Sequence, residues 1–278
     1  MDTVVVTLWI FASTCALTWI LSMITNDTSW VDRIWSIIPA AYVWVYAAGA
    51  SLTNPVLNVM AVLVSAWALR LTFNFARKGG YAPGGEDYRW EILRARMSPR
   101  QFQVFNLFFI VIYQNIILFL IALPAYTVLA SGRTQFGPLE VLLTVAFLCL
   151  LTLETVADQQ QWNFFAHKKA DIAAGREPQS RFLATGLFRF SRHPNFFAEQ
   201  SQWWVIFFFG AAAAGSIMQV TVLGALLLTV LFVGSTRFTE QISVSKYPEY
   251  IEYQYRTSAI IPWFPRKKIK NLPHSASI

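Results

Sequence analysis

Long blocks of apolar residues alternate with short polar segments along almost the whole chain. An apolar block of about 20 residues is typical of a helix that crosses a bilayer. The first block lacks a basic leader and a small-residue cleavage site, so we expect it to remain as a helix. The pattern therefore predicts an all-α integral membrane protein with seven transmembrane helices, at about Val4–Ile24, Ile34–Ala50, Pro55–Ala76, Val104–Ala130, Pro138–Ala157, Asn195–Ala214 and Ser216–Gly234.

Prolines support several of these boundaries. Pro55, Pro138 and Pro194 stand at the start of a predicted span, where a missing backbone N–H is harmless. Pro39 and Pro124 lie inside spans and are expected to kink them. The last two spans are joined by almost no loop, which predicts a tight helical hairpin.

Basic residues predict the orientation. All but three of the 22 lysines and arginines lie in three polar segments: residues 77–100, residues 158–194 and the chain after Gly234. With seven spans these segments fall on one side, which the positive-inside rule makes cytoplasmic. The N-terminus is then outside and the C-terminus cytoplasmic. Topology and an anionic ligand account for the net charge of +7 without a nucleic-acid partner.

Composition agrees with a single membrane domain over residues 1–278. The chain is 55% hydrophobic with a mean hydropathy of +0.44, and no linker or repeat divides it. Cys15 and Cys149 lie in apolar runs and imply no disulfide. We expect the cytoplasmic, cofactor-binding half at about 150–265. Its tyrosine-rich end, Lys246–Pro265, should cap the membrane surface, and Asn271–Ile278 should form a loose tail.

The stretch Gly186–Gly210 concentrates charge beside an apolar run. Arg189, Arg192 and His193 precede a helix predicted to begin at Pro194. Cations next to the free N–H groups of a helix start would attract an anion such as a phosphate. The alternative is that these residues only anchor a helix end by reaching to the interface.

Ionisable residues within or beside the spans are further candidates, because such groups face the bundle interior and pair with another group or a ligand. Asp32 and Arg70 could form an ion pair between helices or take part in catalysis. Asp158 could bind a ribose hydroxyl or an amide, or be a solvated helix end. The glycine-rich, charged loop Gly79–Trp90 could approach a ligand or be an ordinary flexible loop.

Several kinds of site are disfavoured by the sequence. His167, His193 and His274 are scattered, and no Cys/His spacing fits zinc, so we expect no metal site. A di-iron desaturase or hydroxylase would need several histidines. Neither a nucleophile elbow nor a P-loop is present.

Two stretches, GLFRFSRHPNFFAEQSQWW and YPEYIEYQYRTSAIIPWFP, resemble the C-terminal half of the steroid 5-alpha-reductase superfamily. NFARKGGYAPGGEDYRW and ADQQQWNFF resemble its large branch of uncharacterised bacterial and eukaryotic proteins. The resemblance covers about Asp32 to Pro265. It implies a seven-helix membrane reductase that takes NADPH from the cytoplasmic side and transfers hydride to the conjugated C=C bond of a lipophilic enone, such as a sterol-like lipid.

The resemblance also implies roles for particular residues. Arg70 matches a family arginine in the third helix, and the partner acid near the second helix would be Asp32. The steroid reductases have a tyrosine three residues before that arginine, which helps to polarise the substrate carbonyl. Here the position holds Trp67, whose indole N–H can donate. The expected cofactor-binding residues are Asp158, Arg181, Arg189, Arg192, His193, Asn195, Glu199, Glu240 and Tyr247.

Two other functions stay open. RHP followed by Asn195 and an aromatic also resembles membrane methyltransferases of isoprenylcysteine or phospholipids, which use S-adenosylmethionine and carry paired glutamates near the C-terminus. The corresponding stretch here, TRFTEQIS, holds only Glu240. A non-enzymatic lipid-binding protein could share the fold. In each case the partners are the bilayer and a lipophilic molecule, in a bacterial inner membrane or the endoplasmic reticulum.

Overall fold

The structure, a computed structural model, describes residues 2–267. This part of the chain is helical, with no β-strand beyond one isolated bridge, which confirms the all-α expectation. It divides into two compact units: unit 1, Met1–Leu148 with Gln202–Thr229, and unit 2, Cys149–Ser201 with Val230–Ile278. The expected loose tail Asn271–Ile278 and His274 lie outside the described residues.

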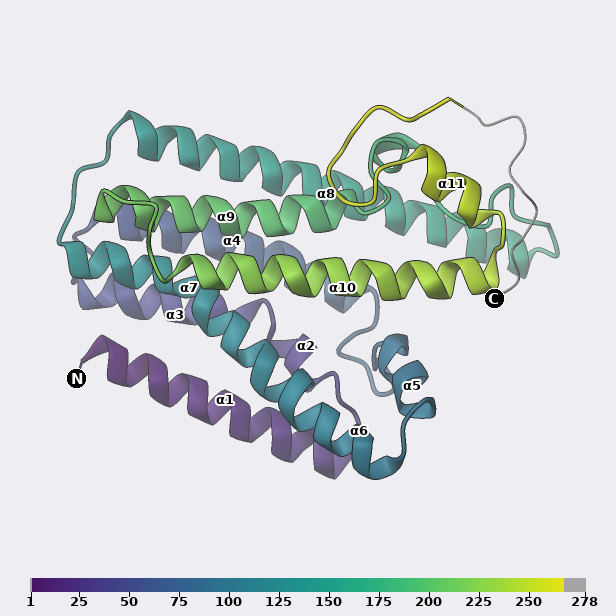
Figure 1. Cartoon of the computed structure of the whole chain (residues 1–278), viewed down its shortest axis with the longest axis horizontal. Helices are drawn as coiled ribbons and strands as arrows, with labels where there is room; N and C mark the ends of the chain where they lie inside the picture. The colour runs from purple at the N-terminus through teal and green to yellow at the C-terminus, as the bar shows by residue number, and fades with distance from the viewer. Residues whose placement is uncertain (1, 268–278) are drawn as a thin grey trace. The chain divides into compact units, whose positions relative to one another are not determined.

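Unit 1 holds the N-terminal helices. Among them, α3 packs against both α4 and α7, with α3 and α7 side by side in Figure 1. The unit also contains the first part of α8, the second part of α9 and the first part of α10. The N-terminal elements are α1 (Thr3–Thr25), α2 (Trp30–Ile34), α3 (Ile37–Gly49), α4 (Pro55–Arg77), α5 (Tyr88–Ala95), α6 (Pro99–Phe105), a π-helix (Asn106–Tyr113) and α7 (Gln114–Ser131).

Helix starts in unit 1 follow from local sequence. The Asn54 side chain accepts from the backbone N–H groups of Val56 and Leu57, and Pro55 begins α4 without an N–H to satisfy. Pro39 was expected to kink its helix. Since α3 begins only at Ile37, that proline lies in the first turn, where no intrahelical donor is missing.

The first helix places its polar side chains inward. The hydroxyl-bearing residues Thr7, Thr14, Thr18 and Ser22 are buried, while Trp9 and Ile24 are among its exposed side chains. Tyr46 donates to Thr7 at 3.2 Å, and Asn106 donates to Ser22 at 3.0 Å. A helix with hydroxyls facing its neighbours and large apolar side chains facing outward fits a lipid environment.

A close approach of two helices fixes the position of one glycine. A Cβ on Gly210 of α9 would lie 2.9 Å from both Cβ and the carbonyl oxygen of Pro124, inside α7. Any larger residue would force the helices apart at this crossing.

Unit 2 contains the rest of the chain and its own helices. It comprises the second part of α8, which runs Pro138–Ala173, a 3₁₀ turn at Gly186–Arg189, the start of α9 (Pro194–Ala214), the end of α10 (Val222–Lys246) and α11 (Tyr250–Arg256). α8 spans 36 residues, so at 1.5 Å per residue it is about 54 Å long.

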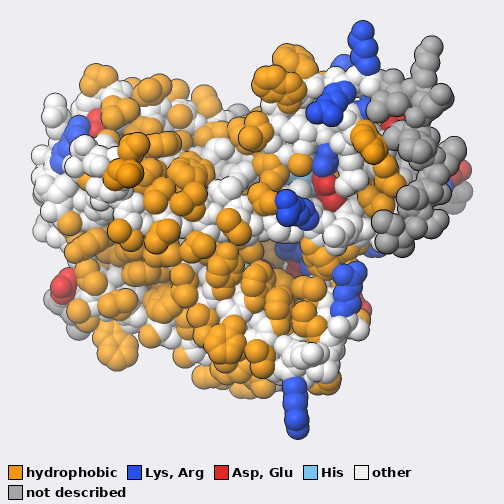
Figure 2. Space-filling view, in the orientation of Figure 1, with side chains coloured by type: hydrophobic (Ala, Val, Ile, Leu, Met, Phe, Trp, Pro, Cys, Tyr) orange, Lys and Arg blue, Asp and Glu red, His pale blue; other side chains and the backbone are white. Residues whose placement is uncertain are grey.

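Five helices among the described residues are long and apolar enough to cross a membrane, namely Thr3–Thr25, Pro55–Arg77, Pro99–Ser131, Pro138–Ala173 and Val222–Lys246. Apolar side chains cover α1 and α7 on the face shown in Figure 2. An α-helical membrane protein in contact with lipid is therefore supported. The expected second and sixth spans correspond to α3, which has 13 residues, and to α9, whose first half is polar. Seven spans remain a prediction.

Candidate functional site

Two tryptophans form a buried pair in unit 1. Trp67 of α4 is 0% exposed and Trp203 of α9 is 2% exposed. Their rings meet edge to face, with centroids 4.8 Å apart. Neither indole N–H has a hydrogen-bond acceptor among the described residues. A buried N–H without an acceptor is costly, so this pair is a candidate for binding an acceptor atom of a ligand.

The predicted catalytic residue Arg70 lies one turn after Trp67 in α4. Its side chain is half-buried and has interactions within the protein. Both residues lie in α4, which corresponds to the span predicted at Pro55–Ala76. Trp203 was missed as a site residue, although it lies four residues after Glu199, a spacing that puts two side chains on one helix face.

Asp32, the third predicted catalytic residue, lies in the short helix α2. Its Oδ2 accepts a hydrogen bond from Trp90 Nε1 at 3.1 Å. Burial and the neighbouring Asp87 carboxylate raise the pKa of Asp32 above its ordinary value. Asp87 itself caps α5 and pairs with Arg89 at 2.7 Å. A protonated Asp32 would carry an O–H able to donate to an acceptor.

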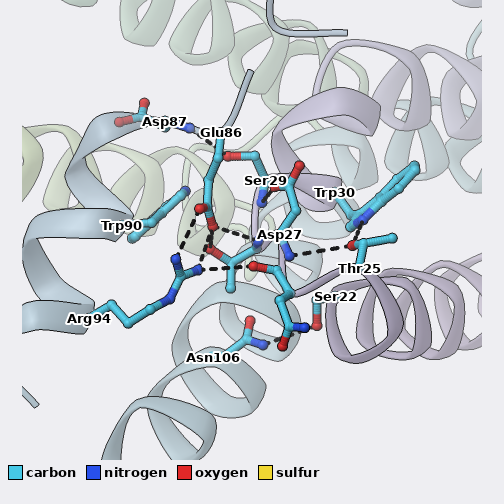
Figure 3. Close-up of polar contacts among 12 residues, drawn as sticks. Ser22, Thr25, Asp27, Ser29, Trp30, Glu86, Asp87, Trp90, Arg94 and Asn106 are labelled. Carbon is cyan, nitrogen blue, oxygen red and sulfur yellow. Dashed lines mark hydrogen bonds and ion pairs between the residues drawn. The ribbon is translucent and has the colours of Figure 1, made fainter. Parts of the chain in front are cut away.

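The glycine-rich loop is anchored by its charged residues rather than left flexible. Glu86 Oε1 accepts from the backbone N–H of Thr28 at 2.8 Å and from the Thr28 hydroxyl at 2.7 Å. Arg94 pairs with the same carboxylate (Figure 3). On the other side of the loop, Arg33 donates to the Gly80 carbonyl at 3.1 Å. These contacts hold the loop against residues 26–33, so the charged side chains of the loop have a structural role.

A buried ionic network occupies the start of α9 in unit 2. Arg192 Nε and Nη2 donate to the two carboxylate oxygens of Glu240, at 2.6 and 2.9 Å. His193 Nε2 lies 3.1 Å from Glu240 Oε1, and Gln254 donates to Oε2 at 2.8 Å. Arg192 Nη1 donates to the carbonyls of Gln254, at 2.9 Å, and Thr257. Both Arg192 and Glu240 therefore have protein partners, and an ionised Glu240 makes His193 Nε2 the donor.

The same region fixes the chain after α11. Arg192 N donates to the Ser258 carbonyl at 2.8 Å, and His193 N donates to the Ala259 carbonyl at 3.1 Å. Tyr253 of α11 donates to the Phe188 carbonyl, and burial raises the pKa of this phenol, so it stays protonated. The RHP motif thus holds the segment that directly follows α11.

Asp158 and Asn195 come together in unit 2. Asp158 is buried, and α8 continues past it to Ala173, so the alternative of a solvated helix end is excluded. Asn195 Nδ2 lies 3.5 Å from Asp158 Oδ1, a long contact. Glu199 is buried in the next turn of α9. The carboxylates and the amide offer the groups that ribose hydroxyls and amides bind.

A second set of unit 2 residues surrounds Tyr247. Lys168 Nζ donates to the Tyr247 hydroxyl at 3.2 Å and to the Arg181 carbonyl at 2.6 Å. Arg181 forms an exposed ion pair with Glu249 at 3.4 Å. Arg189 is exposed. Exposed cations with weak or single partners are the ones that an anion can recruit. Lys168 was missed as a site residue because a lysine in a polar run has no distinguishing spacing.

No group of three potential metal-binding side chains occurs within residues 2–267. Of the three scattered histidines, His193 faces Glu240, as described above.

Comparison with known proteins places the chain in a family. Residues 18–257 match the family described as protein of unknown function (DUF1295). An uncharacterized protein of Schizosaccharomyces pombe is 39% identical over 258 residues, which cover 88% of this chain and 75% of that protein. No solved structure matches the chain. The chain therefore belongs to the DUF1295 family.

Proposed function

We propose that this protein is a membrane reductase that uses NADPH to reduce the conjugated C=C bond of a lipophilic enone, such as a sterol-like lipid. The proposal includes seven spans, with the N-terminus outside and the C-terminus cytoplasmic, on the strength of the basic-residue distribution. The observation that carries it is the buried pair Trp67 and Trp203, whose indole N–H groups have no acceptor among the described residues.

An enone supplies the hydrogen-bond acceptor that the two indole N–H groups lack. Its carbonyl oxygen is an acceptor on an otherwise apolar molecule, which suits an apolar surrounding. When hydride adds to the β-carbon, negative charge develops on that oxygen. N–H donors held in place by packing stabilise this charge more than they stabilise the neutral ketone. A water-derived proton then completes the saturated ketone at the α-carbon, so neither tryptophan has to give up its proton.

Asp32 has a chemical property that fits a supporting role. A carboxyl group whose pKa is raised can hold a proton near neutral pH and donate a hydrogen bond. Arg70 adds a positive charge in the same helix as Trp67. We assign Trp67, Trp203 and Arg70 to carbonyl binding, with Asp32 as a further donor.

The donor set of unit 2 fits NADPH, which when bound supplies the hydride. Asp158, Asn195 and Glu199 would bind ribose and amide groups, and the exposed Arg181 and Arg189 would bind phosphates. Tyr247 and Lys168 would extend the phosphate-binding set. Arg192, His193 and Glu240 would stabilise the start of α9 rather than bind the cofactor, because their side chains already bind one another.

The same network argues against the methyltransferase alternative. A site for S-adenosylmethionine that used Glu240 would need a carboxylate with an oxygen available to the ligand. Both Glu240 oxygens instead accept hydrogen bonds, from Arg192, His193 and Gln254.

A thermal-shift titration of the full-length protein in neutral detergent tests the cofactor. We expect stabilisation by NADPH and not by S-adenosylmethionine, and weaker NADPH binding in Arg181→Ala, while Arg176→Ala, an exposed arginine paired with Asp171, serves as the matched control. Stabilisation by S-adenosylmethionine alone would refute the proposal.

Enone reduction is tested separately by following NADPH oxidation with a steroid enone and confirming the saturated ketone by mass spectrometry. Trp67→Phe and Trp203→Phe keep an aromatic ring but remove the N–H. Each should lower kcat/KM by about tenfold to a hundredfold. Losing one donor to a developing oxyanion costs about a hundredfold to a thousandfold, and here the other tryptophan remains as a donor. Unchanged kcat/KM in both variants would remove the carbonyl-binding role.

A further inference from the structure

The chain after α11 (yellow in Figure 1) is fixed by its backbone. Besides the two hydrogen bonds from Arg192 N and His193 N, Trp263 N donates to the Phe190 carbonyl at 2.8 Å, and Ser191 Oγ donates to the Ile260 carbonyl at 2.7 Å. Main-chain hydrogen bonds at several points hold a segment in one conformation. The side chains of this segment are therefore displayed from a defined position.

Those side chains are large, apolar and exposed. Ile261, Trp263 and Phe264 are 67%, 71% and 78% exposed. Basic residues lie beside them, and apolar and basic side chains adjoin around α11 in Figure 2. A segment that combines exposed Trp and Phe with arginines has the composition of a membrane-interface contact.

This segment lines a cavity of about 360 Å³. Arg266 N donates to the Arg256 carbonyl at 2.8 Å, which brings two basic residues to the same rim. Arg256 has an ion pair with Glu252 only at 4.0 Å. Thr257 and Ser258 also line the cavity. The described lining contains no carboxylate: it consists of Arg192, Gln254, Tyr255, Arg256, Thr257, Ser258, Ala259, Trp263, Phe264 and Arg266.

We propose that this cavity binds the phosphate of an anionic membrane lipid, with Trp263 and Phe264 beside its acyl chains. Arginines and hydroxyls are the side chains that bind phosphate oxygens. The volume lies in the range of small-molecule pockets, about 300–1,000 Å³. The exposed aromatics explain why the phosphate belongs to a lipid rather than to a free anion, since free phosphate gains nothing from them. Arg192 lines the cavity and also supports the proposed cofactor region, but the phosphate is assigned to Arg256 and Arg266, which the reductase proposal does not use.

The test uses full-length protein in neutral detergent, titrated with three probes: dioctanoyl phosphatidylglycerol, dioctanoyl phosphatidylcholine and inorganic phosphate. We expect saturable binding of phosphatidylglycerol and much weaker binding of the other two. The double variant Arg256→Gln with Arg266→Gln should weaken phosphatidylglycerol binding about thirtyfold, from about fivefold for each cation at an anionic surface. Arg176→Gln, which removes an exposed arginine elsewhere in unit 2, should leave it unchanged.

A second variant separates the lipid from a free phosphate. Trp263→Ala keeps every cation and should weaken phosphatidylglycerol binding while leaving any phosphate binding as it was. Three results would overturn the proposal: equal affinity for phosphatidylcholine and phosphatidylglycerol, inorganic phosphate binding as tightly as the lipid, or a double variant that binds the lipid as the unaltered protein does.

Discussion

Replacing Arg192 by methionine tests the network that joins the start of α9 to α10 and to the end of α11. The substitution keeps most of the side-chain length but removes four donated hydrogen bonds, two to Glu240 and two to backbone carbonyls. Arg192 and Glu240 side chains are only 9% and 8% exposed, so the remaining carboxylate would stay buried without its cation. Removing one partner of a buried ion pair costs about 3–5 kcal/mol. For a chain of this size, 1 kcal/mol lowers Tm by about 2–4 °C.

We therefore expect Arg192→Met to lower the Tm by about 6–20 °C, measured by tryptophan fluorescence of the detergent-solubilised protein. Arg176→Met is the matched control, because Arg176 also binds one carboxylate, Asp171, through two nitrogens but is 65% exposed. An exposed pair contributes about 0–1 kcal/mol. Adding Glu240→Gln to Arg192→Met should recover part of the loss. A Tm for Arg192→Met no lower than that of Arg176→Met would refute the reasoning.

Three further predictions concern other parts of the chain. Gly186→Ala should destabilise by about 1–3 kcal/mol, because φ is +62° and its Cβ would lie 2.5 Å from Gln160 Oε1; chemical denaturation measures this. Asn106→Leu removes the hydrogen bond to Ser22 and should cost about 0.6–2 kcal/mol by the same assay, and no change would make that contact dispensable. Because burial raises the pKa of Asp32 in the folded state, protonated Asp32 contributes to the free energy of unfolding at low pH, and this contribution is lost as pH rises through the folded pKa. The Tm of Asp32→Asn should therefore increase relative to that of the unaltered protein as pH rises from about 4.

The sequence predicted correctly that the long helices exist but not where several of them begin and end. Hydropathy placed the end of the fifth span at Ala157 and of the seventh at Gly234, whereas α8 continues to Ala173 and α10 to Lys246. Hydropathy detects the part of a helix that suits lipid, but backbone hydrogen bonding continues wherever residues tolerate it. The seventh span was also placed too early: Gly215, in a left-handed conformation, ends the preceding helix region, and α10 begins at Val222.

For the candidate sites, the sequence identified charged residues but not their partners. Arg192 and Glu240 are 48 positions apart, and no local pattern connects them. The pair Trp67 and Trp203 was not predicted as a pair, because the sequence gives no sign of which apolar side chains are buried together. Trp203 lay within a recognised stretch, yet only its burial and the absence of an acceptor among the described residues single it out from neighbouring aromatics.

The cations that the sequence grouped together as anion-binding differ in their exposure and in their protein partners. Arg192 is buried and donates to four protein acceptors, so recruiting it to a phosphate would require breaking a pair worth several kcal/mol. Arg181 is 58% exposed, and its pair with Glu249 at 3.4 Å contributes about 0–1 kcal/mol, which a phosphate can readily replace. Binding of an anionic cofactor in unit 2 should therefore depend on Arg181 and Arg189, while Arg192 should govern the stability of the region that presents them.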